Sequence, residues 1–227
     1  MAIASVLIGL LCLAAIVLVA VLLRRQSLAR QSMRARYFDG VMPLFSDLRA
    51  SLVPTGFPRI SGVYQGREFD LQVVPDTLTL RKLPTLWLLV TLPSAQLVKS
   101  SLHLMMRPTG VESFSNFATL PRQVTQPRGY PADCAMRSDG DVAPALLDLV
   151  ARQLAVLDQD KLKELVITPK GLRLVWLIEE ADRGRYLIFR DAEMGRAPLG
   201  PPLLTPLLQV LTDLECRLTE LAKSEAA

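Results

Sequence analysis

The chain has 227 residues, of which 50% are hydrophobic and 21% are charged, and its formal net charge is +4. One histidine and three scattered cysteines do not supply a disulfide framework, a zinc site or the usual ligands of haem and iron–sulfur clusters. We therefore expect no metal ion and no cofactor.

The first stretch of the chain predicts a membrane anchor, because no charged residue lies between Ala2 and Leu23. At about 1.5 Å per helical residue, this length matches the roughly 30 Å hydrocarbon layer of a bilayer. A cleaved secretory signal is the alternative, but such signals have a cationic start, a shorter apolar core and a small-residue cleavage site. A lipoprotein signal at Cys12 is weaker still, because the bulky Leu10 and Leu11 precede it.

Five arginines follow the apolar stretch, and we call them the collar: Arg24, Arg25, Arg30, Arg34 and Arg36. The first acidic residue is Asp39, so the collar carries the excess positive charge and the remaining chain is close to neutral. Nucleic-acid binding needs a dense cationic face on the binding domain, so we expect no nucleic-acid partner. The collar suits anionic membrane lipids instead.

The collar also predicts the orientation of the chain. Arginine and lysine near a spanning helix are retained on the cytoplasmic side. We therefore expect the N-terminus outside and the domain in the cytoplasm, at the inner (cytoplasmic) membrane. The excess of arginine over lysine is typical of a GC-rich bacterial genome.

Small residues recur at helical spacing within the anchor, at Ala2, Ser5, Gly9 and Cys12. Such a stripe lets a second helix approach closely, so it is a candidate helix-packing surface for a membrane-protein partner. The alternative is that small residues are simply common in spanning helices.

We divide the chain into an anchor (1–23), a basic juxtamembrane collar and stalk (24–58) and one cytoplasmic domain (59–227). The anchor helix is expected to continue to Arg36, because no proline or glycine interrupts it. A second short helix is expected at Leu44 to Leu52, where leucines recur every four residues.

From Arg59 the periodicity becomes that of strands. Phe69, Leu71 and Val73 alternate with polar residues, which indicates a half-buried strand, and Leu86 to Leu92 is apolar on both faces, which indicates a central one. Further strands are expected at Ile60–Tyr64, Leu78–Leu80, Ser101–Met106, Leu165–Thr168, Leu172–Ile178 and Tyr186–Phe189, with an edge strand around Cys134.

Amphipathic helices are expected at Pro144 to Leu157 and at Leu203 to Leu221. Residues 107–131 are expected to be surface loops pinned to the core by Phe114, Phe117 and Leu120. The predicted fold class is α+β, with a single N-terminal transmembrane helix followed by one domain that has a mainly antiparallel sheet and two or more packed amphipathic helices.

Catalytic signatures are weak. His103 is the only histidine, and no G-x-S-x-G nucleophile motif accompanies it. The carboxylates of Asp139 and Asp141, and those of the run Glu179 to Asp182, read as solvated loops, and no glycine-rich phosphate loop is present. We predict no catalytic, cofactor-binding or metal-binding residue.

A second candidate contact surface combines arginine with aromatic residues: Arg183, Arg185, Tyr186 and Arg190. Arginine and tyrosine recur as anchors of protein interfaces, so this segment is a candidate docking face. The alternative is an ordinary strand.

These patterns favour a non-enzymatic, membrane-anchored accessory, assembly or scaffold subunit of a larger membrane complex, for example a bioenergetic one. It would act by protein–protein contact at the cytoplasmic face. The alternative is an enzyme or a lipid- or ligand-binding domain that acts on a membrane-derived substrate.

Overall fold

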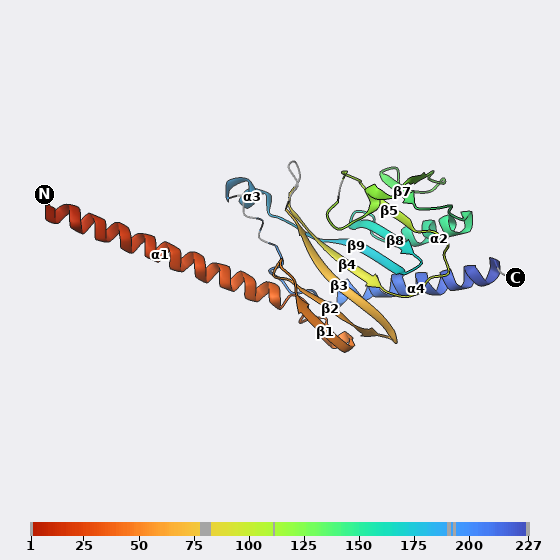
Figure 1. The fold of residues 1–227 in the computed structure, drawn as a ribbon, viewed down its shortest axis with the longest axis horizontal. Coiled ribbons are helices and arrows are strands. Elements are labelled where there is room, and N and C mark those ends of the chain that lie inside the picture. Colours follow the sequence, from red (N-terminus) through yellow and green to blue (C-terminus); the bar gives the residue numbers. More distant parts are fainter. Residues whose placement is uncertain (1, 78–82, 111, 190–191, 193, 226–227) are drawn as a thin grey trace.

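A computed structural model describes residues 2–77, 83–110, 112–189, 192 and 194–225, and Figure 1 shows a long helix that extends from a sheet domain. The elements in chain order are α1 (Ala2–Ala35), η1 (Met42–Leu44), β1 (Ser46–Leu52), β2 (Pro58–Tyr64), β3 (Arg67–Asp76), β4 (Thr85–Leu92), β5 (Leu102–Met106), η2 (Phe117–Thr119), β6 (Arg122–Val124), β7 (Cys134–Ser138), α2 (Pro144–Leu154), β8 (Leu162–Thr168), β9 (Gly171–Glu180), α3 (Arg183–Phe189) and α4 (Pro201–Glu225).

The strands of the described chain form one nine-stranded sheet in the order β1-β2-β3-β4-β9-β8-β5-β7-β6. Every pairing between neighbours is antiparallel. The predicted class, α+β with a large antiparallel sheet, is therefore confirmed. β4 lies between β3 and β9, as its apolar sequence predicted, and Leu86, Leu88 and Val90 are fully buried.

The strands expected within residues 60–73 and 165–178 are present and pair as the hairpins β2–β3 and β8–β9. Gln65 and Gly66 join β2 to β3 with φ angles of 49° and 78°. Two successive positive φ angles are typical of a type I′ turn, whose twist matches that of the flanking strands. Gly66 has the backbone freedom this turn requires.

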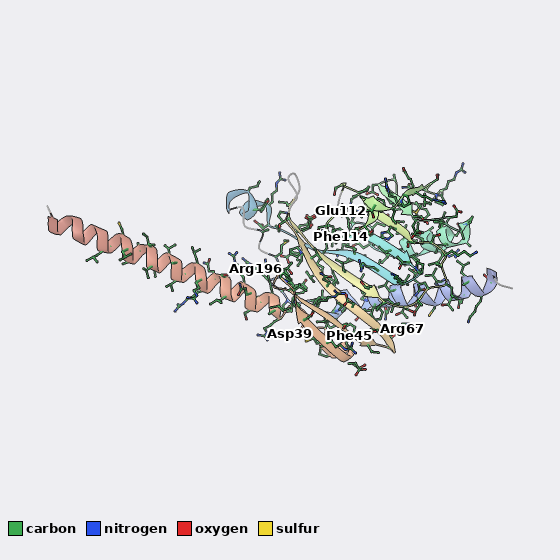
Figure 2. The ribbon with its side chains drawn as sticks, in the orientation of Figure 1. Asp39, Phe45, Arg67, Glu112, Phe114 and Arg196 are labelled. Carbon is green, nitrogen blue, oxygen red and sulfur yellow. The ribbon has the colours of Figure 1, made fainter. Side chains whose placement is uncertain are left out.

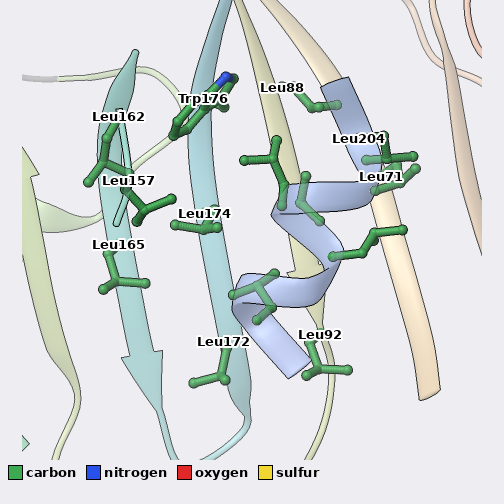
Figure 3. Close-up of a cluster of buried hydrophobic side chains, with 14 of the residues drawn as sticks. Leu71, Leu88, Leu92, Leu157, Leu162, Leu165, Leu172, Leu174, Trp176 and Leu204 are labelled. Atoms are coloured by element: carbon green, nitrogen blue, oxygen red, sulfur yellow. The ribbon is translucent and has the colours of Figure 1, made fainter. Parts of the chain in front are cut away.

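One face of the sheet carries the main hydrophobic core. Side chains from β3, β4, β8 and β9 belong to the same buried cluster as leucines of α2 and α4. Figure 3 shows Leu204 of α4 beside Leu71 of β3, with leucines of β8 and β9 nearby. The two expected amphipathic helices are thus present, although α2 ends at Leu154 and α4 begins at Pro201.

The prediction of a helix at residues 44–52 is wrong. Only Met42–Leu44 forms a short 3-10 turn, and Ser46–Leu52 is the edge strand β1, which pairs with β2. The leucine spacing favoured a helix locally, but backbone hydrogen bonds with β2 decide the conformation. β1 has a bulge between Ser46 and Arg49, where Asp47 has a φ of 51°. A bulge shifts the alternation of side chains between the two faces of the sheet, so the sequence of β1 does not show the regular alternation of a strand.

Two other strand predictions need correction. Cys134 does lie on a strand, β7, but β7 is interior, because β6 pairs with its outer side. β6 comes from the segment that was expected to be all loop. Tyr186 to Phe189 belongs to the helix α3 and not to a strand. The strand expected at Leu78–Leu80 lies outside the described residues.

Candidate functional site

The described part of α1 is long and apolar enough to cross a membrane. Its large apolar side chains from Leu10 to Leu23 are 44% to 70% exposed, and nothing in the described chain covers them. Length and composition alone do not separate an anchor from a signal sequence. Gly9 and Cys12 of the small-residue stripe lie on α1, and the side chains of Ala2 and Ser5 lie outside the described residues, so helix packing stays a prediction.

The collar divides into two parts. Arg24 and Arg25 are exposed on α1, and Arg30 is half-buried one to two turns further along the same helix. The Arg34 guanidinium lies 5.1 Å from the centre of the Phe57 ring and donates to the carbonyl of Thr55, and Arg36 pairs with Asp39 at 3.0 Å. The last turn of the helix therefore contacts the domain directly.

The residues just after α1 lie in the core of the domain. Tyr37 is 2% exposed and Phe38 is fully buried, with ring centroids 5.5 Å apart. Tyr37 also meets Phe57 edge-on at 5.3 Å, and its carbonyl accepts a hydrogen bond from Leu199 N at 2.7 Å. We call Tyr37, Phe38, Phe57 and Leu199 the root of α1. The root holds α1 to the sheet domain through the short turn at residues 36–41.

The candidate docking face is not a strand face. Arg183, Arg185 and Tyr186 lie on α3, where Tyr186 N donates to the carbonyl of Asp182 at 2.9 Å. Both sides of β9 are already paired, with β4 and with β8, so the segment after it has no strand partner and forms local hydrogen bonds instead. Arg190 and the side chain of Arg185 lie outside the described residues.

A buried polar group lies on the opposite face of the sheet from α4, around Glu164, which is 1% exposed. Glu164 Oε1 lies 2.9 Å from His103 Nδ1 and accepts a hydrogen bond of 2.5 Å from Ser115 Oγ. In a catalytic triad the histidine lies between the serine and the carboxylate. Here serine and histidine share one carboxylate oxygen, so the arrangement fixes the loop that carries Ser115 on the sheet.

The same loop is held by a buried ion pair between Lys163 and Glu112, whose side chains are each 6% exposed. Lys163 Nζ lies 2.7 Å from Glu112 Oε1 and donates to the carbonyl of Arg107 at 2.9 Å. Thr109 Oγ1 donates to the same carboxylate at 2.6 Å. Burial raises the pKa of Glu112, but the hydrogen bonds from Lys163 and Thr109 outweigh it and leave the pKa below its ordinary value.

Aromatic contact completes this attachment. The Phe114 ring lies 5.6 Å from that of Trp87, in a second hydrophobic cluster with Leu89 and Val175. Figure 2 shows Phe114 beside Glu112. The expectation that three residues pin residues 107–131 is thus confirmed for Phe114 and Phe117, which are 9% and 6% exposed, while Leu120 is only half-buried. The sequence analysis did not predict the polar contacts of this loop, which are the Lys163–Glu112 ion pair and the hydrogen bond of Ser115 to Glu164.

A cavity of about 360 Å³ lies beside the Lys163–Glu112 pair. Trp87 and Leu177 form part of its lining, together with the acidic residues Asp76, Asp160 and Glu180. Its cations serve the fold: besides Lys163, Arg107 donates to the carbonyls of Gln159, Asp160 and Leu162. Among the described residues, no three or more His, Cys, Asp or Glu side chains form a group that could hold a metal ion.

Three of the acidic residues named from the sequence have structural partners: Asp139, Asp141 and Glu179. Asp139 accepts from Ser101 N at 2.7 Å, and Asp141 pairs with Arg122. Glu179 accepts from Gly195 N at 2.9 Å. These carboxylates are not brought together into one site.

Comparison with protein-family models, with curated proteins and with solved structures gives no match.

Proposed function

We propose that the chain is a non-enzymatic, membrane-anchored accessory or scaffold protein, which contacts a membrane-protein partner at the cytoplasmic face. The observation that carries this proposal is the root of α1, in which Tyr37 and Phe38 are buried within two or three residues of the helix end at Ala35. An anchor joined to its domain in this way presents one face of the domain at a set height and rotation.

The helical turns between Leu23 and Ala35 span about 18 Å at the rise of an α-helix. A partner in the same membrane therefore meets the domain within a narrow range of heights. Confinement to one membrane raises the effective concentration of the two proteins, so even a small contact surface suffices. This supports a contact role more than a role that needs a freely moving domain.

The alternative, an enzyme or ligand-binding domain, has less support. His103, Ser115 and Glu164 do not have the order of a catalytic triad, and Lys163 is held by Glu112 and by backbone carbonyls. The polar groups that would do chemistry are already used to fix a loop.

For the location, we propose the inner membrane, with the N-terminus outside and the domain in the cytoplasm. The exposed Arg24 and Arg25 at the end of the apolar stretch support it. A green fluorescent protein fused to the C-terminus is expected to fluoresce, and alkaline phosphatase fused there is expected to be inactive. An active phosphatase with a dark fluorescent fusion would contradict this orientation.

The contact role is tested by loosening the joint between anchor and domain. A Gly-Ser insertion equal to about two helical turns, placed between Ser27 and Leu28, is expected to abolish most crosslinking to the membrane partner, because it removes the set height and rotation. The measurement is crosslinking in native membranes followed by affinity purification and mass spectrometry.

The matched control appends the same Gly-Ser sequence after Ala227, where it leaves the joint intact, and it should recover the same membrane protein as the unaltered chain. If the unaltered chain, the insertion variant and the control all recover the same partner, the contact does not depend on the rigid joint between α1 and the domain. Recovery of the chain alone from all three would remove the proposed partner.

A further inference from the structure

α3 is an exposed helix at the anchor end of the molecule. Figure 1 shows it standing away from the sheet and level with the last turns of α1, while α2 and the end of α4 lie at the opposite end. Arg183 is exposed at its start, and Leu187 is 58% exposed near its end. Leu52, Leu97 and Val156 are more exposed still, so the exposure of Leu187 counts only together with its place on α3.

Both ends of this segment are fixed to the domain. Before α3, Ala181 is 3% exposed and its N–H donates to the carbonyl of Pro84 at 2.8 Å, which ties it to the start of β4. After α3, Met194 is buried, Gly195 N donates to Glu179, and Leu199 N donates to Tyr37 of the root. α3 is thus held between the membrane-proximal end of the sheet and the root of α1.

We infer that α3 is a second membrane contact, with Leu187 and Arg183 resting on the anionic surface of the bilayer that α1 crosses. The inference rests on the proposed membrane anchoring. Since α1 continues as a helix from Leu23 to Ala35, the domain core stands off the bilayer. Of the labelled elements of the domain, α3 lies furthest toward the N-terminal end of α1 (Figure 1).

The chemistry of the segment suits this position. Basic and apolar residues on a short helix bind the headgroup layer by burying the apolar side chain and pairing the cation with lipid phosphate. The aliphatic stem of arginine lets Arg183 cover apolar surface while its guanidinium stays at the phosphates. The exposed Arg24 and Arg25 of α1 are expected at the same layer, so the lipid surface continues from one contact to the other. A protein docked on α3 is the competing occupant.

The test uses the full chain in vesicles, with Leu187→Cys labelled by an environment-sensitive fluorophore. Cys12 and Cys216 are first replaced by serine, and Cys134 is kept, because burial raises the pKa of its thiol to about 11 and keeps it protonated. The matched control is Val156→Cys, which is 72% exposed just after α2, at the far end of the domain.

In vesicles of phosphatidylcholine with phosphatidylglycerol, lipid-attached quenchers are expected to quench the label at position 187 severalfold more than the label at 156. Iodide in the water is expected to show the reverse order. Arg183→Gln should lower the lipid-contacting fraction of the 187 label by up to about fivefold in these anionic vesicles, and should change little in phosphatidylcholine alone.

Three results would overturn the inference. Equal iodide access at positions 187 and 156 in vesicles that carry the protein would refute the α3 contact and leave the anchoring intact. Protection of the 187 label only in native membranes would assign α3 to a protein partner. Failure of the unlabelled chain to float with vesicles would refute the anchoring itself. Unchanged tryptophan fluorescence of each variant shows that the domain is folded.

Discussion

Replacing Lys163 by methionine is expected to lower the free energy of unfolding by about 3–5 kcal/mol, because it leaves the Glu112 carboxylate buried without its cation. Glu112 is 7% exposed, so water does not replace the lost partner. The measurement is urea unfolding in detergent micelles, followed by tryptophan fluorescence. Trp87 and Trp176 both lie on strands of the sheet, so the signal reports the domain and not α1.

The control for Lys163→Met is the double variant with Glu112→Leu. Removing both charges is expected to restore most of the stability, because a buried ion pair repays its own desolvation only partly. A cost below about 1 kcal/mol for the single variant would show that the pair behaves like an exposed one.

The dependence of stability on pH gives a second readout for the same pair. Because the pKa of Glu112 is lowered in the folded protein, its contribution is fully present above the unfolded value of about 4.3 and is lost as the pH falls through the folded pKa. The unaltered chain should therefore lose more stability than the double variant below about pH 4. Parallel acid titrations of the two proteins would contradict this assignment.

The parts of the fold that could be predicted are those where local pattern and tertiary environment agree. β4 is buried on both faces, so its sequence is apolar throughout, and the β2–β3 hairpin shows clear alternation around Gln65 and Gly66. β1 and α3 could not be predicted in the same way. A bulge disturbs the alternation of β1, and both sides of β9 are already paired, so the segment that follows it cannot add a strand beside it.

The polar contacts of the candidate site are harder to find in a sequence. Lys163 and Glu112 look like ordinary solvated charges, and only the pairing of β5 with β8 brings their segments together. His103 was noticed because it is the only histidine, but its partner Glu164 carries no signal of its own. A charged residue within a buried strand, such as Glu164, is the one cue available, because such residues are rarely buried without a partner.

A substitution in the root of α1 is expected to lower the free energy of unfolding by as much as Lys163→Met does. Phe57 is fully buried, with the Tyr37 ring at 5.3 Å on one side and the Arg34 guanidinium at 5.1 Å. Gly195, with a φ of 75°, approaches so closely that a Cβ there would lie 2.6 Å from a Phe57 ring carbon. Phe57→Ala is expected to lower the free energy of unfolding by about 3–5 kcal/mol in the same urea assay, because the cavity it leaves cannot be refilled.

Phe57→Ala should also loosen the joint between α1 and the domain, since the ring links Arg34 on the helix to Tyr37 in the core. Spin labels on Leu28→Cys and Ser51→Cys, in the background with Cys12 and Cys216 replaced by serine, measure this as the width of their distance distribution in vesicles. The distribution is expected to be narrow in the unaltered chain and broad in Phe57→Ala without denaturant.

The matched control is Phe57→Leu, which keeps most of the side-chain volume. It should lower the free energy of unfolding by less and keep a narrow distance distribution. If Phe57→Ala lowers stability and the distribution stays narrow, the ring only fills the core, and the set orientation of the domain must come from the backbone bond between Leu199 and Tyr37.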